Sequence, residues 1–135
     1  PAAIPECHFN KEAFEGQENE RVRIGVKYVP GEKNTLGTVF IDESFPLIEE
    51  VKKYWVERFV EQHALEVEKA VRLVYKTAMA CRVGQLLLMM KKMGLTHHEL
   101  EDTLLSNHAL TASLYGLVSE HAVLKQKTTR YRRIK

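Results

Sequence analysis

The sequence predicts an α+β fold that is mainly α: an N-terminal β-hairpin, then a long helix that we expect to be broken, then two to three shorter helices. Two observations predict this class. Residues 21–41 hold two short segments of alternating polarity around Pro30-Gly31. After Pro46 the chain contains no further proline, and its apolar residues recur at helical spacing. The 135 residues, 44% hydrophobic and 28% charged, suit one domain with a buried core.

Composition divides the chain into three parts. Residues 1–20 are predicted to be an irregular segment, because Pro1 and Pro5 oppose helix. Residues 21–124 are predicted to form a single α-rich domain that includes the hairpin. Residues 125–135 follow it as a basic tail.

Each part of the hairpin has its own signal. Residues 21–29 alternate with a period of two, which is typical of a half-buried strand. Pro30-Gly31 suits the centre of a type II turn, because proline sets its own φ and glycine accepts a positive one. A second strand is expected over residues 35–41. Two strands alone are marginally stable in water, so the hairpin must pack on helices or join the sheet of a second copy.

The long helical part is predicted to begin with Ser44 as its N-cap and Pro46 in the first turn, where a missing N–H is harmless. An apolar stripe follows and becomes a seam with 4-3 spacing, typical of a helix that packs on other helices. Its members are Leu47, Val51, Trp55, Phe59, Val60, Ala64, Val67, Val71, Val74, Ala78 and Cys81. A single helix over residues 45–93 would be about 73 Å long. We therefore expect a break, at residues 62–64.

Three local signals define the shorter helices. Gly94 is expected to end the long helix in the left-handed conformation. Thr96 and Glu99 have the spacing of a capping box, which predicts a short helix after them. Ser106 or Asn107 is expected to cap the last helix.

Charge is unevenly distributed along the chain. The net charge is +2, yet residues 1–124 contain 14 basic and 18 acidic residues and so carry −4, while the basic tail carries +6. Such a tail is expected to bind phosphate or an acidic protein surface, with Tyr131 available to stack on a base. The alternative is a solvated end. The predicted binding residues are Lys125, Lys127, Arg130, Tyr131, Arg132, Arg133 and Lys135.

Residues 86–90 are apolar on every side of the predicted helix. A segment of this kind is buried all round, either in its own core or against a partner. A small domain with a lone hairpin has little internal surface to cover it, which favours a homo-oligomer or a larger protein complex. The predicted interface residues are Leu86, Leu87, Met89, Met90 and Met93.

Residues 93–104 read Met-Gly-Leu-Thr-His-His-Glu-Leu-Glu-Asp-Thr-Leu. This stretch resembles the first half of a repressor-type helix-turn-helix, but Glu101 replaces a small residue and Leu105 replaces the turn glycine. The resemblance implies a small dimeric DNA- or RNA-binding regulator that uses residues 95–121 with the basic tail. Those residues carry four acids and no base, which opposes phosphate binding and favours two capped helices packed on the long one. The side chains placed to reach bases would be Asn107, His108, Thr111 and Ser113.

No residue pattern indicates catalysis, a cofactor or a metal. The only metal-like spacings are His97 with Glu101 and His98 with Asp102, and a third ligand is lacking. Acidic pairs are sequence neighbours that point apart on a helix. Cys7 and Cys81 form no C-x-x-C motif and are expected to be reduced thiols, with Cys81 in the core, although spacing alone leaves a disulfide between them open.

The leading functional prediction is a non-enzymatic helical subunit for protein–protein interaction. It would self-associate or dock into a larger complex and be anchored by its basic tail to nucleic acid or an acidic partner. No apolar run has the length of a membrane span, and residues 1–10 lack a basic start followed by an apolar stretch. We therefore expect no membrane partner and an intracellular, cytoplasmic protein that is not secreted.

Overall fold

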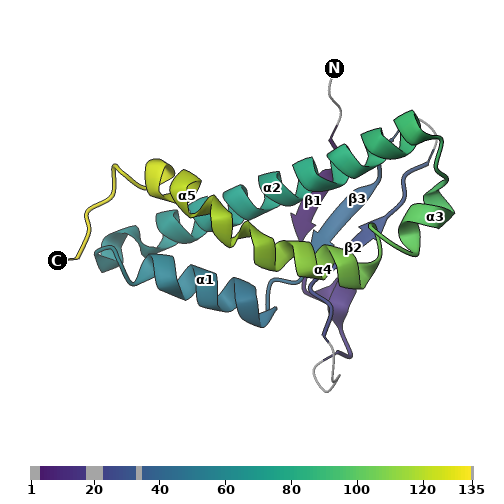
Figure 1. Ribbon diagram of the computed structural model, residues 1–135. Coiled ribbons are helices and arrows are strands. Elements are labelled where there is room, and N and C mark those ends of the chain that lie inside the picture. Colours follow the sequence, from purple (N-terminus) through teal and green to yellow (C-terminus); the bar gives the residue numbers. More distant parts are fainter. Residues whose placement is uncertain (1–3, 18–22, 33–34, 135) are drawn as a thin grey trace.

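The computed structural model describes residues 4–17, 23–32 and 35–134 (Figure 1). It has the predicted α+β, mainly helical architecture, with a small sheet covered by the long helix and its neighbours. The elements are β1 (Glu6–Phe9), η1 (Glu12–Phe14), β2 (Val26–Val29), β3 (Thr38–Ile41), α1 (Pro46–Val56), η2 (Glu61–His63), α2 (Ala64–Met93), α3 (His97–Glu101), α4 (Asn107–Gly116), η3 (Leu117–Glu120) and α5 (His121–Lys127), where η denotes a 3-10 helix.

The predicted hairpin is present, and a third strand extends it. Strands β2 and β3 pair antiparallel, with Tyr28 opposite Val39. Both strands are shorter than predicted, and residues 21 and 22 of the first lie outside the described part. The expectation that the whole of residues 1–20 is irregular was wrong, because β1 pairs parallel to β3, with Cys7 opposite Val39. This third strand answers the instability of a two-stranded hairpin without a second copy.

Glycine closes the loop between β2 and β3. The loop extends beyond Pro30-Gly31, and its described turn contact is the Thr35 amide donating to the Glu32 carbonyl over 2.9 Å. Gly37 follows with φ of +83°, a conformation that side chains disfavour. A Cβ at this position would also collide with the Val29 carbonyl. The strand therefore starts at Thr38, after the glycine, and not at Thr35.

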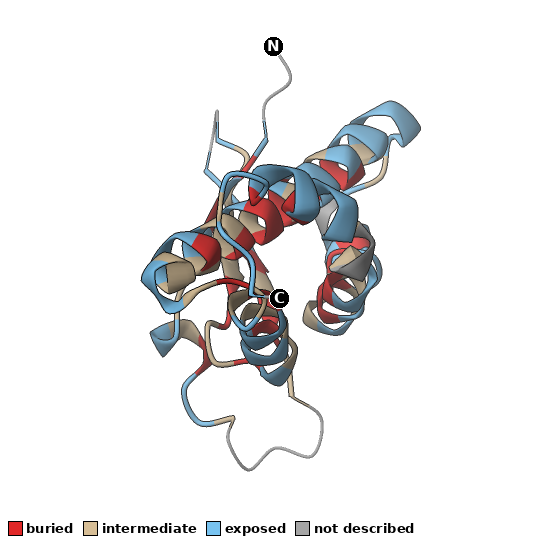
Figure 2. Ribbon diagram, turned by 90° about the vertical axis from the view of Figure 1, so that its left-hand side faces the viewer, coloured by how far each residue is buried: buried red, intermediate tan, exposed pale blue. Residues whose placement is uncertain are grey.

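A long helix, α2, spans the molecule and its apolar side is shared by sheet and helices (Figure 1). Its inner face packs on β1, β3, α1 and α5, while α4 covers β2. Figure 2 shows buried residues on the inward sides of the helices and exposed residues on their outer sides. The seam is buried as predicted at Val67, Val71 and Val74.

Cys81 is exposed, so its predicted place in the core was wrong. After Val74 the buried face of α2 moves to Tyr75, Met79 and Val83. An ideal helix drifts about 20° per heptad against a strict 3.5-residue repeat, which explains the movement. Cys7 is the buried cysteine, and both cysteines are free. Burial raises the pKa of the Cys7 thiol to about 12, opposed by the positive charge of Lys76.

The long helical stretch is broken, as predicted, between α1 and α2. Helix α1 ends at Val56, and the chain turns through η2 before α2 begins at Ala64. The break starts earlier than residues 62–64, because Val60 is extended, with ψ of 149°. Its amide donates to the Arg132 carbonyl instead of to a helical partner. The C-terminal residues thus satisfy a backbone group that the break leaves free.

Helix ends follow most of the predicted caps. The Thr96 hydroxyl accepts from the Glu99 amide and the Ser106 hydroxyl from the Ala109 amide. Gly94 ends α2 with φ of 70°. Ser44 is not the N-cap of α1. Phe45 has that position, because the backbone and hydroxyl of Ser44 donate to the buried carboxylate of the preceding Asp42.

Candidate functional site

The predicted basic tail is docked on the body of the protein. Its first residues continue α5, and residues 128–134, the C-terminal segment, then run along the connection between α1 and α2. The Val60 amide donates to the Arg132 carbonyl and the Ile134 amide to the Arg58 carbonyl, each over 2.9 Å. Phe59 and Arg133 face each other in an antiparallel bridge. Backbone pairing therefore holds the arginines in a defined arrangement.

Two side chains anchor the segment from within. Thr128 is fully buried, and its hydroxyl donates to the Leu124 carbonyl over 2.7 Å. The Tyr131 ring lies edge-on to Phe59, with centroids 6.2 Å apart, and 5.2 Å from the ring of His63. Tyr131 is thus packed inside the protein's own surface, which leaves less of its ring for a base than the sequence analysis assumed.

The cationic side chains of this region point outward. Lys125, Lys127, Arg130, Arg132 and Arg133 are exposed, and none forms an ion pair with a carboxylate in the described residues. Some guanidinium groups rest on nearby rings instead. These pairs are Arg130 on Tyr131, Arg133 on Phe59, and Arg58 on Tyr54. Exposed cations without acidic partners keep their charge available for an anion. Lys135 lies outside the described residues.

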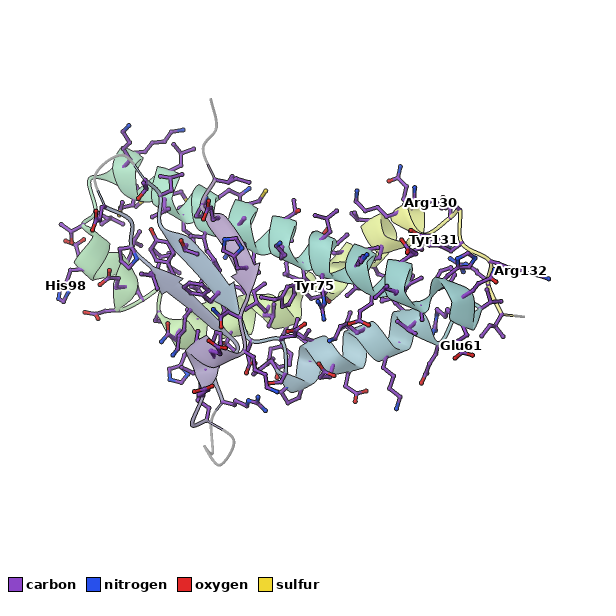
Figure 3. The ribbon with its side chains drawn as sticks, turned by 180° about the vertical axis from the view of Figure 1, so that it is seen from behind. Glu61, Tyr75, His98, Arg130, Tyr131 and Arg132 are labelled. Atoms are coloured by element: carbon purple, nitrogen blue, oxygen red, sulfur yellow. The ribbon has the colours of Figure 1, made fainter. Side chains whose placement is uncertain are left out.

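A groove of about 500 Å³ separates α2 from the C-terminal segment. Lys69, Lys127 and Arg130 bring positive charge to it, and Glu66 is the one acid that lines it. Figure 3 shows Arg130, Tyr131 and Arg132 at one end of the molecule and His98 at the opposite end. The docked segment and this groove together form what we call the basic end. Lys69 and Arg58 belong to it although they lie far from the tail in sequence.

The predicted partner interface divides into buried and exposed residues. Leu86 and Leu87 belong to the core, at 4% and 6% exposure, and are not available to a partner. Met90 is half-buried. Met89 and Met93 are exposed, at 49% and 64%, together with Leu88 at 54%. Met89 and Met93 lie four residues apart and therefore on the same side of the helix.

The predicted helix-turn-helix residues are used inside the fold. Thr111 is buried, and its hydroxyl oxygen accepts from the amides of Gly25 and Val26 at 2.9 and 3.2 Å. Helix α4 therefore joins the sheet to the domain through this side, and Thr111 cannot contact a base. The Ser113 hydroxyl donates to the Ala109 carbonyl. His108 is exposed and Asn107 half-buried.

The histidine–carboxylate pairs do not build a metal centre in the described residues. His98 lies 3.6 Å from the Asp102 carboxylate, and both side chains are well exposed. Nowhere in the described ranges do three or more His, Cys, Asp or Glu side chains gather in a way that could hold a metal ion. The side chain of His97 lies outside the description.

Comparisons of the chain with protein-family models, with curated proteins and with solved structures find no match. Among the helices of the described residues, none is both long and apolar enough to cross a bilayer. The residues themselves therefore carry the functional inference.

Proposed function

We propose that the protein is a non-enzymatic interaction subunit that binds a nucleic acid backbone through its basic end. The supporting observation is the docking of the C-terminal segment, which arranges exposed arginines that have no acidic partner in the described residues. Phosphate groups bound by Lys and Arg release counterions, so affinity comes from charge and depends on salt. Contacts of this kind position a nucleic acid without reading its sequence.

Docking matters energetically. A free tail loses conformational freedom when it binds, at a cost of about 1–2 kcal/mol for each backbone residue that becomes ordered. Residues 132–134 already have a paired backbone in the free protein. Most of that cost is therefore met during folding, which favours binding to an extended single strand.

Self-association or docking into a larger complex is the second part of the proposal. The exposed side chains of Leu88, Met89 and Met93 lie in the last two turns of α2. Methionine adapts to irregular surfaces, which suits a contact with a protein partner or a second copy. Met89→Asp with Met93→Asp would place charge in this contact, and the mass of the protein in solution should fall to that of the monomer. An unchanged mass would remove this part.

The nucleic acid proposal is tested by titrating a fluorescent single-stranded DNA with the protein at several salt concentrations. Log affinity should fall linearly with log salt, with a slope of about −0.7 for each phosphate neutralised. Arg132→Gln with Arg133→Gln should weaken binding by about tenfold or more and make the slope shallower by about 1.

The matched control is Lys91→Gln with Lys92→Gln, since these exposed lysines at the other end of α2 give the same change in net charge. Equal weakening by both double variants would show that net charge alone matters and would contradict a basic end. Binding to polyglutamate but not to DNA would replace the nucleic acid with an acidic protein partner.

A further inference from the structure

A second groove, of about 440 Å³, lies between α1 and α5 and is distinct from the groove of the basic end. Its walls are mostly aromatic, and we call it the aromatic groove. The rings come from three helices: Tyr54 and Trp55 from α1, Tyr75 from α2 and His121 from α5. Glu50, one turn before Tyr54, lines the groove with a carboxylate. Its volume is within the range of small-molecule sites.

Three of the rings are close neighbours. The centroids of Trp55 and His121 are 4.8 Å apart, those of Tyr54 and Trp55 5.7 Å, and those of Tyr54 and His121 6.0 Å. A cation seated on this group lies within reach of all three, since cation–π attraction acts within about 6 Å of a ring centroid. Tyr54 already accepts one cation, because the Arg58 guanidinium stands 3.4 Å from its centroid. Arg58 does not line the aromatic groove.

Tyr75 supplies an unused polar group. Its side chain is 1% exposed and lines the aromatic groove, yet no hydrogen bond of its hydroxyl exists among the described residues. Figure 3 places Tyr75 in the middle of the molecule, far from the arginines at the end. A buried hydroxyl without a partner costs free energy that a ligand oxygen would recover by accepting its hydrogen bond.

The electrostatics select the sign of the ligand. Among the described residues that line the groove there is no lysine or arginine. Glu50 is exposed and forms no ion pair within the described chain. Burial raises the pKa of Tyr75 to about 12, and the negative charge of Glu120 adds to the effect. An anion would meet two carboxylates and the negative faces of the rings, whereas a cation is favoured by both.

We propose that the aromatic groove binds a small organic cation with a methylated ammonium group and a nearby oxygen. The ammonium rests on the rings of Tyr54, Trp55 and His121 with Glu50 as its counter-charge. The ligand oxygen accepts the hydrogen bond of Tyr75. This binding is independent of the nucleic acid proposal, because the basic end shares none of these residues.

Choline is the probe, and Trp55, the one tryptophan of the chain, is the reporter. Its fluorescence should change saturably, with a dissociation constant on the order of 1 mM for so small a ligand. The neutral isostere, in which carbon replaces the ammonium nitrogen, should give no saturable change. Equal responses to both would mean a merely apolar groove and would overturn the proposal.

Two variants test the residues. Glu50→Gln and Tyr54→Leu should each weaken choline binding by about two- to fivefold, and both sites are exposed enough to keep the fold. Glu57→Gln is the matched control, since it removes an exposed carboxylate on the same side of the chain break but outside the groove. The indole N–H signal of Trp55 in NMR spectra provides a second readout. No shift of this signal with choline, or equal weakening by the control, would refute the assignment.

Discussion

The amide of Val60 donates to the carbonyl of Arg132 over 2.9 Å, and this bond joins the turn between two helices to the C-terminal segment. The turn has lost its helical hydrogen bonds at this point, and the segment supplies the missing acceptor. Beside the bond, Phe59 is 1% exposed and lies edge-on to Tyr131. The basic end is thus part of the folded structure.

Deletion of residues 130–135 should therefore destabilise the protein. The deletion removes the acceptor of Val60 and uncovers the ring of Phe59, and we expect a loss of about 2–4 kcal/mol in the free energy of unfolding. Urea unfolding measures it. Arg132→Gln with Arg133→Gln is the control, because these exposed side chains should change stability by no more than about 0.5 kcal/mol. Equal stability of the deletion and the full chain would mean that the segment is not docked.

Replacing Thr111 by valine tests the link between α4 and the sheet. Its buried hydroxyl accepts from two amides, at Gly25 and Val26, and valine has the same shape without the acceptor. The substitution should lower the free energy of unfolding by about 1–3 kcal/mol, because buried donors lose their partner. Thr77→Val on the exposed side of α2 is the control. Urea midpoints that shift equally for both variants would contradict the role of Thr111.

The same residue illustrates where sequence reasoning succeeded and failed. Short-range signals predicted the caps at Thr96 and Ser106 and the left-handed Gly94, because each depends on neighbours within one turn. Thr111 resembled a surface residue of a recognition helix. Its true partners, Gly25 and Val26, lie far away in the chain, and no local pattern announces such a pairing.

The candidate sites show the same limit. The charge of the basic tail was evident from the sequence, but its docking depends on Val60, whose bond to Arg132 is long-range. Strand β1 was missed because four residues give too short an alternation and its partner β3 comes much later. The aromatic groove was also missed. Trp55 was interpreted as part of an apolar stripe, and nothing local to Tyr75 or His121 indicates that their rings line one groove with it.

Gly37→Ala should destabilise the hairpin. The residue has φ of +83°, and a Cβ there would meet the Val29 carbonyl. Strain of the left-handed backbone costs about 1–2 kcal/mol, and the collision adds to it. Gly16→Ala is the matched control, since Gly16 has φ of +88° with open space around it. Thermal unfolding should show a clearly larger loss for Gly37, and equal losses would mean that backbone strain alone operates.

The two cysteines should differ in reactivity at neutral pH. Cys81 is exposed on α2, and an alkylating reagent should modify it quickly. Cys7 is buried, and its raised pKa keeps it as an unreactive thiol. Mass spectrometry of the digested protein should find modified Cys7 only after unfolding. Rapid modification of Cys7 in the folded protein would contradict its burial.

The raised pKa of Cys7 also predicts how stability depends on alkaline pH. The unfolded chain loses this proton near the ordinary pKa of 9.0, whereas the folded protein holds it up to about 12. The stabilising effect of the protonated thiol is therefore complete below pH 9 and is lost as the pH rises towards 12. Tyr75, raised from 10.0 to about 12, contributes in the same direction. Urea unfolding of Cys7→Ala across this window should show a shallower decline than the parent protein, with Cys81→Ala as the control. If the parent and Cys7→Ala decline in parallel, Cys7 ionises equally in both states and this account of its burial fails.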